Sequence, residues 1–531
     1  MGKEWILACI LFTSFLPNFT PNNHNSSPDN RMMNSIHNSS YDPANLTDMP
    51  LEMIVSRRMS IRSIDSDKPV PWELVSEVLW AAYGYSSQGR TVPSLCGYPV
   101  IIYVCNETAA YKFDPAKQSV AIWKEGDYRT FAGELQFYPA PIQLYIALDT
   151  NICQDFHWGH AETGCALQSV YLMANSLNLG TVSQGRWKDQ YIHEMLGLPQ
   201  NEAILFKMPL GYPLPPCVDY QNLVSTFRPS SAELPQIKDG FMPLRDALDS
   251  VFPSHEWSEN PVTKQELSQI LWASYGFSYY EDTAATPPKR HRTVPSAASY
   301  YPMKIYVADS SGVYQYIPEH HTLALVSPRD RRLSIAQASG NLWASSAPVI
   351  VALAWNESQT YATDYSYVEV GLITQNVFLE SVAWGLAADW GRADSDEKAM
   401  RDSLGLTGVA ELHPVSIIAL GHRSISETTT TAITSTPTTT TITTSPSPTT
   451  ATSVTTSIST SVVSTTTVTP TTIETTTVTP TTTQTTTYTT TAPPPASLWM
   501  EWWFWMIVGV GVVLVVMGAV WKLRRGLQKQ T

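Results

Sequence analysis

Two short apolar runs stand out in the pattern of hydrophobic and polar positions along the chain. IQLYIAL follows Ala140 and Pro141, and VIVAL follows Ala347 and Pro348. Apolar runs of this length, rich in β-branched residues, are typical of buried strands. We therefore expect a central sheet strand in each of two regions of the chain.

Each run is followed by a segment with apolar residues at helical spacing. The segments are GCALQSVYLMANSLNLG, residues 164–180, and GLITQNVFLESVAWGL, residues 371–386. Their apolar positions cover most of the helix circumference, which is typical of a helix with no solvent-exposed face. We expect both segments to form buried helices.

Local signals mark the start of a further helix in each region. Thr263 and Glu266 have the spacing of a capping box, in which the two side chains bind backbone N–H groups at the helix start. Pro71 stands where the first turn of a helix tolerates proline. We expect helices to begin at both places.

The same landmarks occur twice, in the same order, when residues 72–213 are compared with residues 262–423. LWAAYG is matched by LWASYG, RTVPS occurs in both parts, and the strand, buried helix, helix end and last strand follow in both. Such self-similarity indicates an internal duplication, and the mixed element order predicts an α+β fold. We place copy one at residues 51–214 and copy two at residues 256–423, with 215–255 as a linker or an ordered wrap.

The two ends of the chain differ from the repeated part. Residues 1–20 carry Lys3 before an apolar run that has the length of a signal-peptide core, which predicts an export signal. Residues 21–50 form an Asn- and Ser-rich spacer, and residues 424–497 are so rich in Thr, Ser and Pro that they predict a stalk.

The apolar residues 499–521 match the thickness of a bilayer, and the basic residues 522–531 follow as a cytoplasmic tail. We therefore expect a single-pass protein of the cell membrane with extracellular globular domains. Asn-x-Ser/Thr triplets, each a weak signal for a glycoprotein, begin at Asn18, Asn25, Asn38, Asn45, Asn106 and Asn356.

Charge and cysteine usage narrow the functional classes. The formal net charge of −13 argues against nucleic acid as a partner, because phosphate binding needs a concentrated basic face.

The cysteines outside the predicted signal are odd in number and all lie in the first half, so the sequence supports no particular pairing and no zinc pattern. His157 and His160 lack a third clustered ligand, and we predict no metal.

The ordered motifs RxSxR at 58–62, LWAAYG, RTVPS, LGLP and PLGYP resemble the nitroreductase family of flavoproteins, in particular the branch that includes azoline dehydrogenases. The resemblance covers residues 54–213 and, more loosely, residues 256–422. It implies a central, mainly antiparallel sheet flanked by helices in each copy, and two copies that intertwine. The tandem chain would then form an intramolecular pseudo-dimer with FMN in the groove between its halves.

The resemblance also implies which residues hold the cofactor. Arg58, Ser60 and Arg62 would bind the phosphate, because guanidinium groups and a hydroxyl suit a dianion. The loop at Pro295 and Ser296 of copy two would close over the flavin. The backbone N–H of Gly185 would approach the flavin N5, and Gly391 is its expected match in copy two.

Each of these residues also has a plain structural interpretation. The arginines could form a solvated basic turn, the Pro-Ser loops could only shape the sheet edge, and Gly185 could cap a helix. A second phosphate contact from Arg228 is a weaker suggestion. No side chain presents itself as an acid or base, so catalytic residues stay unassigned.

Copy two departs from the family pattern because no RxSxR precedes its LWASYG. We therefore expect at most one competent flavin site, with the loop at Pro93 and Ser94 facing a degenerate second groove. The leading hypothesis is an FMN-dependent oxidoreductase that acts on a small organic acceptor outside the membrane, with an unknown electron donor. The alternative is a flavin-free duplicated domain that serves as a surface binding or structural module.

Overall fold

The computed structural model describes residues 49–131, 134, 137–185, 189–215, 217, 228–282 and 289–424. The predicted export signal, the membrane helix and its tail lie outside these residues, as do the spacer up to residue 48 and the stalk beyond residue 424. Among the described residues, no helix combines the length and the apolar character needed to cross a membrane.

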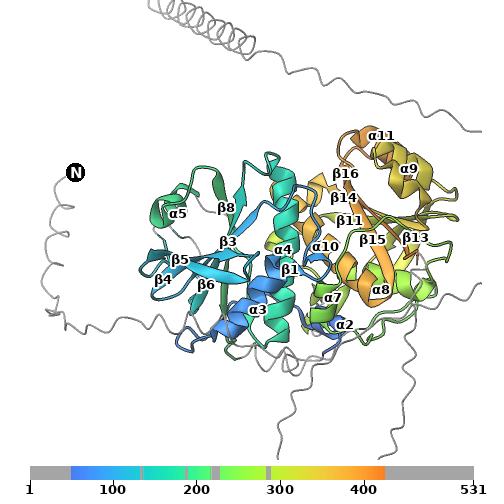
Figure 1. The fold of residues 1–531 in the computed structure, drawn as a ribbon. Coiled ribbons are helices and arrows are strands. Elements are labelled where there is room, and N and C mark those ends of the chain that lie inside the picture. The colour runs from blue at the N-terminus through green and yellow to red at the C-terminus, as the bar shows by residue number, and fades with distance from the viewer. Residues whose placement is uncertain are drawn as a thin grey trace, which may run out of the picture. The chain divides into compact units, whose positions relative to one another are not determined.

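Copy one contains a six-stranded antiparallel sheet in the order β5-β4-β3-β6-β8-β7 (Figure 1). The predicted central strand is β6, which lies between β3 and β8. The elements are α2 (Leu51–Arg57), α3 (Trp72–Tyr83), β1 (Tyr85–Ser86), β2 (Gly89–Arg90), β3 (Val100–Cys105), β4 (Ala109–Asp114), β5 (Ser119–Glu125), β6 (Ile142–Asp149), α4 (Phe156–Ser176), β7 (Gly180–Thr181), α5 (Asp189–Leu196) and β8 (Glu202–Gly211).

Copy two repeats this sheet in the order β13-β12-β11-β14-β16-β15, again antiparallel throughout. The predicted α+β fold, with two tandem domains of the same topology, is therefore confirmed. The elements are α8 (Lys264–Tyr275), β9 (Phe277–Asp282), β10 (Lys289–Arg292), β11 (Met303–Asp309), β12 (Gly312–Ile317), β13 (Thr322–Ser327), α9 (Arg332–Ala338), β14 (Val349–Asn356), α10 (Thr363–Ala383), β15 (Leu386–Arg392), α11 (Glu397–Leu404) and β16 (Leu412–His422), with 3₁₀ turns at Ala297–Ser299, Leu342–Ser346 and Glu357–Gln359.

The local helix signals are also confirmed. α8 begins with a complete capping box between Thr263 and Glu266, and α3 begins directly after Pro71. Both buried helices begin before the segments that the apolar pattern marked. α4 starts at Phe156 because the Asp155 carboxylate accepts hydrogen bonds from the N–H groups of His157 and Trp158.

The segment between the two copies carries a helix of its own, α7 (Leu244–Asp249), with Leu244, Ala247 and Leu248 buried. Pro50, before α2, and Pro243, before α7, form a β-bridge with each other. α7 therefore occupies the same position in copy two that α2 occupies in copy one. The described part of the segment between the copies is an ordered wrap and not a loose linker.

The central helices α4 and α10 pack directly against each other between the two sheets (Figure 1). Gly164 and Gly371 lie at the crossing, where a Cβ atom on Gly371 would overlap the carbonyl oxygen of Ala161, and one on Gly164 would overlap that of Val368. The Cys165 thiol donates to the Gly371 carbonyl at 3.3 Å. Glycine at both positions allows the two backbones to approach this closely.

Polar side chains of the central helices cross from one copy to the other. Gln168 of α4 donates to the Asn376 side chain at 2.8 Å and to the Thr293 carbonyl at 3.2 Å. Gln375 of α10 donates in the same way to the Thr91 carbonyl at 3.0 Å. Each central helix therefore fixes the RTVPS turn of the other copy, so both RTVPS turns depend on the pairing of the helices.

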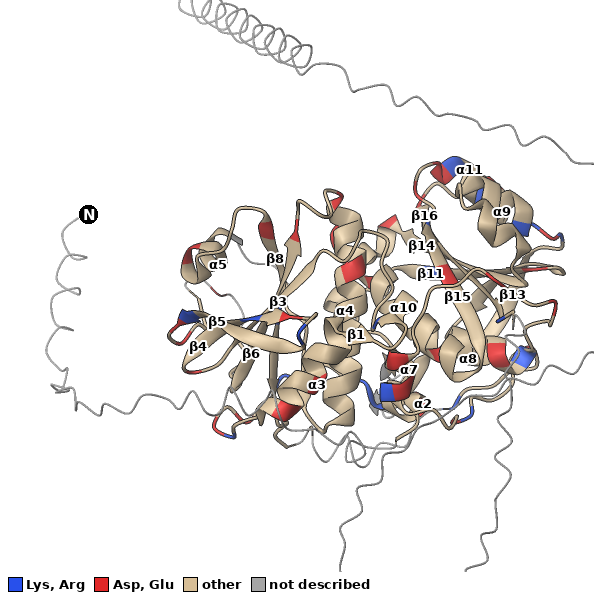
Figure 2. Cartoon of the chain, viewed as in Figure 1, with Lys and Arg blue, Asp and Glu red and all other residues tan. Residues whose placement is uncertain are grey.

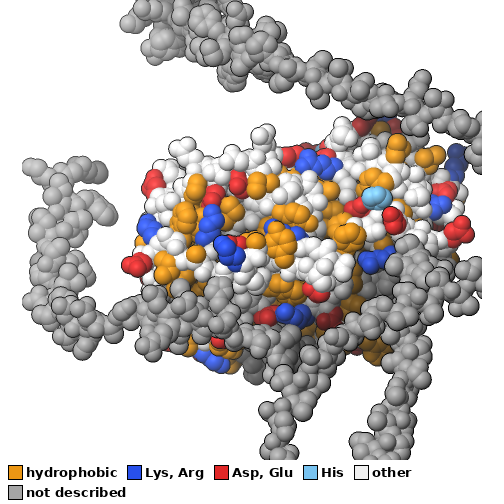
Figure 3. All heavy atoms as spheres, in the orientation of Figure 1, with side chains coloured by type: hydrophobic (Ala, Val, Ile, Leu, Met, Phe, Trp, Pro, Cys, Tyr) orange, Lys and Arg blue, Asp and Glu red, His pale blue; other side chains and the backbone are white. Residues whose placement is uncertain are grey.

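Charged residues are dispersed over both copies in the view of Figure 2, with no gathered basic face. On the face shown in Figure 3, apolar side chains lie in small groups among polar and charged ones.

Gly371→Ala tests whether close contact between the central helices holds the fold together. Helix propensity alone would stabilise the protein by about 1 kcal/mol, because alanine is the better helix former. The overlap with the Ala161 carbonyl forces the helices apart, and we expect a net loss of about 1–3 kcal/mol in the free energy of unfolding. Chemical denaturation of both proteins measures the difference, and an unchanged or raised stability would contradict the packing.

Candidate functional site

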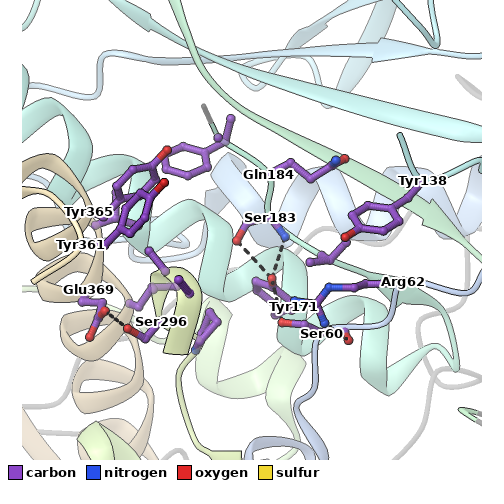
Figure 4. A pocket seen from close by; sticks show the side chains of 18 residues that line it. Ser60, Arg62, Tyr138, Tyr171, Ser183, Gln184, Ser296, Tyr361, Tyr365 and Glu369 are labelled. Atoms are coloured by element: carbon purple, nitrogen blue, oxygen red, sulfur yellow. Dashed lines mark hydrogen bonds between the residues drawn. The ribbon is translucent and has the colours of Figure 1, made fainter. Parts of the chain in front are cut away.

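A cavity of about 410 Å³ lies between the two copies and is lined by both (Figure 4). One wall comes from copy one, at the RxSxR segment and the residues after β7. The other comes from the Pro-Ser loop of copy two and the first turns of α10. The lining residues are Ser60, Arg62, Tyr138, Tyr171, Val182, Ser183, Gln184, Gly185, Phe206, Pro295, Ser296, Ala297, Ala298, Tyr361, Tyr365, Val368, Glu369 and Leu372.

Tyr171 of α4 organises the copy-one wall (Figure 4). Its hydroxyl accepts the Ser183 N–H at 2.6 Å, donates to the Ser183 hydroxyl at 3.1 Å and lies 3.3 Å from the Ser60 hydroxyl. The backbone positions this segment as well, because the Ile61 N–H donates to the Thr181 carbonyl at 2.9 Å. Ser60, Arg62 and Ser183 are thereby held on one side of the cavity.

Arg58 lies behind this wall and does not line the cavity. Its guanidinium is 5.3 Å from the centre of the Tyr171 ring, and Nη2 donates to the Arg292 carbonyl of copy two at 3.2 Å. The side chain is only 1% exposed, and Nε and Nη1 have no hydrogen-bond partner. Buried, unpaired donors on a cation are costly, so this group calls for an acceptor, such as an anion.

The Pro-Ser loop of copy two is held by Glu369 of α10 (Figure 4). The hydroxyl of Ser296 donates to one carboxylate oxygen, and the hydroxyl of Tyr275 donates to the other at 2.7 Å. Burial raises the pKa of Glu369 to about 7, although these two hydrogen bonds lower it in part. Copy one has the same arrangement, in which the Glu162 carboxylate accepts hydrogen bonds from the Ser94 hydroxyl at 2.6 Å and from the Tyr83 hydroxyl at 2.8 Å.

Gly185 faces the start of α10 across the cavity. A Cβ atom at Gly185 would lie 2.6 Å from the Tyr365 hydroxyl oxygen, so glycine at this position lets Tyr365 lie directly against the backbone. Phe206 and Tyr361 flank Tyr365 with ring centres 6.0 Å and 5.6 Å away. No sequence motif marks these three aromatic residues. The only signal for them was an i, i+4 pair of tyrosines just before the helical segment.

The structure thus brings together Ser60, Arg62, Gly185, Pro295 and Ser296 around one cavity, and Arg58 lies directly behind it. Arg228 lies elsewhere, because its guanidinium is bound by Ser56 and Asp239.

The corresponding groove of copy two has different residues at the equivalent positions. The Ser254 N–H donates to the Ala388 carbonyl at 2.9 Å, as the Ile61 N–H does to Thr181, so Pro253 and His255 take the places of Ser60 and Arg62. By the same count, Val251 replaces Arg58. His255 contacts the Asp389 carboxylate at 3.1 Å. The segment therefore has no arginine and lies beside a partly buried acid on β15, which does not suit a phosphate.

The expected match between Gly185 and Gly391 is wrong by one residue. Gly180 pairs with Gly211 in copy one and Ala387 pairs with Gly421 in copy two, so counting along both chains sets Gly185 against Arg392.

Arg392 adds a large side chain to the second groove, where the first groove has Gly185. Its guanidinium lies 4.9 Å from the ring centre of Trp158 and 3.1 Å from the Asp155 carboxylate. Trp158 is itself the counterpart of Tyr365 and is 1% exposed.

The histidine pair takes part in ordinary contacts. His157 stacks on Tyr367 and contacts Asp364 at 3.0 Å, whereas His160 is bonded through Nδ1 to the Phe156 carbonyl at 2.7 Å. Across the described ranges, no three His, Cys, Asp or Glu side chains gather in a way that could hold a metal ion.

Glu369 makes the stability of the protein depend on pH. Between pH 4.5, the ordinary pKa of a glutamate side chain, and about 7, the unfolded chain releases this proton while the folded chain keeps it, so rising pH favours unfolding. We expect the free energy of unfolding to fall by up to roughly 3 kcal/mol over this window and Glu369→Gln to remove that share. Denaturation at pH 5 and pH 8 measures it. A difference between variant and wild type that is equal at both pH values would contradict the assignment.

Comparison with known proteins agrees with this architecture. A family model described as the nitroreductase family matches residues 55–212 and 256–422. A candidate nitroreductase of Methanocaldococcus jannaschii is 32% identical over 167 residues, covering 29% of this chain and 79% of that protein. An NADPH-flavin oxidoreductase of Vibrio harveyi is 32% identical over 92 residues, covering 16% of this chain and 38% of that protein.

Among solved structures, a candidate nitroreductase of Anabaena variabilis aligns with a TM-score of 0.54 at 15% identity, over 74% of this chain and 97% of that one. At this identity the likeness concerns the fold alone. The two matched regions together cover more than half of the chain, and each contains the repeated sheet. The chain therefore belongs to the nitroreductase family of oxidoreductases, with two nitroreductase-like domains in tandem.

Proposed function

We propose that the chain is an FMN-dependent oxidoreductase with one flavin site, which lies in the cavity between its two copies. The observation that carries the proposal is the composite wall, with Ser60 and Arg62 from copy one facing Pro295 and Ser296 from copy two. The volume of the cavity, about 410 Å³, lies within the roughly 300–1,000 Å³ that is common for ligand pockets.

The residues around the cavity fit FMN. Arg58 offers two buried donors without a partner, and Arg62 and Ser60 add a second guanidinium and a hydroxyl, which together suit a phosphate dianion. Gly185 adds no side chain of its own to the cavity, and the side chains that lie next to its backbone are those of Tyr365 and Phe206. When bound, the flavin would supply the hydride-carrying ring, and the protein would bind, orient and shield it.

The aromatic wall supports a small organic acceptor. Tyr361, Tyr365 and Phe206 offer ring faces and hydroxyl groups, and Val368 and Leu372 add apolar surface below them. Such a lining orients a flat molecule by stacking and limits the entry of water. Tyr365 is the side chain nearest to the Gly185 position, so it would contact an acceptor close to the site of hydride transfer.

The alternative, a flavin-free binding or structural module, has support only at the second groove. There Arg392 takes the place of Gly185, and its guanidinium lies against Trp158, the counterpart of Tyr365. The first groove has glycine in place of that arginine and keeps its phosphate donors, which favours the enzyme.

We further propose that the oxidoreductase is anchored in the cell membrane by residues 499–521, with its globular part outside. The support is the apolar length of that segment and the basic residues after it.

Substitution of the phosphate-binding residues tests the flavin site. We expect Arg62→Ala to weaken FMN binding by about 10- to 100-fold, because a hydrogen bond to a charged group is worth roughly 1.5–3 kcal/mol. The matched control is His255→Ala, at the equivalent position of the second groove, which should leave FMN affinity unchanged.

The measurement is a titration of the full chain with FMN, followed by quenching of flavin fluorescence. Equal losses in the two variants, or no loss in Arg62→Ala, would show that FMN does not bind at this wall.

A further inference from the structure

Two cysteines approach each other beside the second groove. Cys96 follows the loop at Pro93 and Ser94, and Cys153 precedes the central helix α4. Their sulfur atoms are 2.7 Å apart, although the two residues are far apart in sequence. Cys153 is 3% exposed and Cys96 is half-buried, so a small reagent can reach the pair from the Cys96 side.

Backbone hydrogen bonds hold both sulfur-bearing segments in place. The Ser94 hydroxyl accepts the N–H groups of Cys96, Gly97 and Tyr98 at 3.2, 2.9 and 3.0 Å. On the other side, the Cys153 N–H donates to the Asp149 carbonyl at 3.0 Å, and Asp155 caps α4 two residues later. The contact therefore follows from two fixed turns, and small side-chain rotations suffice to reach the S–S bond length of about 2.05 Å.

We propose that Cys96 and Cys153 form a disulfide bond that fixes the copy-one loop to the start of α4. The oxidant is a small or protein disulfide. One cysteine thiolate attacks a sulfur of that disulfide and releases one thiol, and the other cysteine then attacks the mixed disulfide and releases a second thiol. Two protein thiols are oxidised, one disulfide is reduced to two thiols, and the S–S bond of the reagent is exchanged for the bond in the protein.

The surroundings favour this reaction. The hydrogen bond with Cys153 and burial raise the pKa of Cys96, although Arg392 of copy two, whose Nη2 lies 3.4 Å from the Cys96 sulfur, lowers it, so Cys153 supplies the thiolate. The hydrogen bond with Cys96 lowers the pKa of Cys153, although burial opposes it. Cys165, by contrast, is fully buried at the helix crossing, and burial raises its pKa.

The cross-link would act on one groove only. In copy two the residue equivalent to Cys96 is Ala298, which lines the flavin cavity. The loop over the second groove would therefore be locked covalently, whereas the loop over the flavin cavity would not.

Mass spectrometry of the full chain tests the bond directly. The protein is purified without reductant in N-ethylmaleimide and digested under non-reducing conditions. We expect one linked pair of peptides that contains Cys96 and Cys153. Recovery of both cysteines as N-ethylmaleimide adducts, or linked to other cysteines, would overturn the proposal.

Thermal unfolding of variants gives a second test. Dithiothreitol should lower the Tm of the wild type by about 5 °C, and Cys96→Ser and Cys153→Ser should each lack this shift. Cys217→Ser, the control, should keep both the linked peptides and the shift. A wild-type Tm that does not respond to dithiothreitol would contradict the proposal, and if either variant fails to fold, the peptide analysis of the wild type decides.

Discussion

The contact between the central helices α4 and α10 is the constraint on which the rest of the structure depends. Gly164 and Gly371 let the two backbones touch, and Gln168 and Gln375 then reach across to the RTVPS turns of the opposite copies. Because those turns lead into the two Pro-Ser loops, the walls of both grooves are set by the helix pair. The duplication therefore supplies within one chain the interface that the family resemblance attributes to two subunits.

The two grooves share a scaffold but differ in the side chains that enter them. The paired arrangement of Ser, Glu and Tyr is the same in both, with Glu162 in one copy and Glu369 in the other. What differs is the residue beside it, which is Gly185 in the first groove and Arg392 in the second. A tandem chain can change one copy without changing the other, and the asymmetry of the grooves is a direct consequence.

Much of the fold was predictable because it depends on short-range patterns. The apolar runs at β6 and β14, the cap at Thr263 and the repeated motifs all act locally, and they led to the observed elements. The pairing of cavity walls was predictable only through the family resemblance, because spacing alone does not bring residue 60 near residue 296. The difference between the two grooves was harder still to predict. A one-residue difference in strand register decides whether Gly391 or Arg392 faces the second groove. The aromatic wall of the first cavity carries no sequence motif.

The most direct measurement is the number of FMN molecules that the purified full chain binds, from flavin absorbance near 450 nm after saturation with FMN and removal of the excess. A phosphate-binding wall in the first groove and its absence from the second predict one FMN per chain. Two per chain would contradict the absence of a phosphate site from the second groove, and none would contradict the flavin site itself.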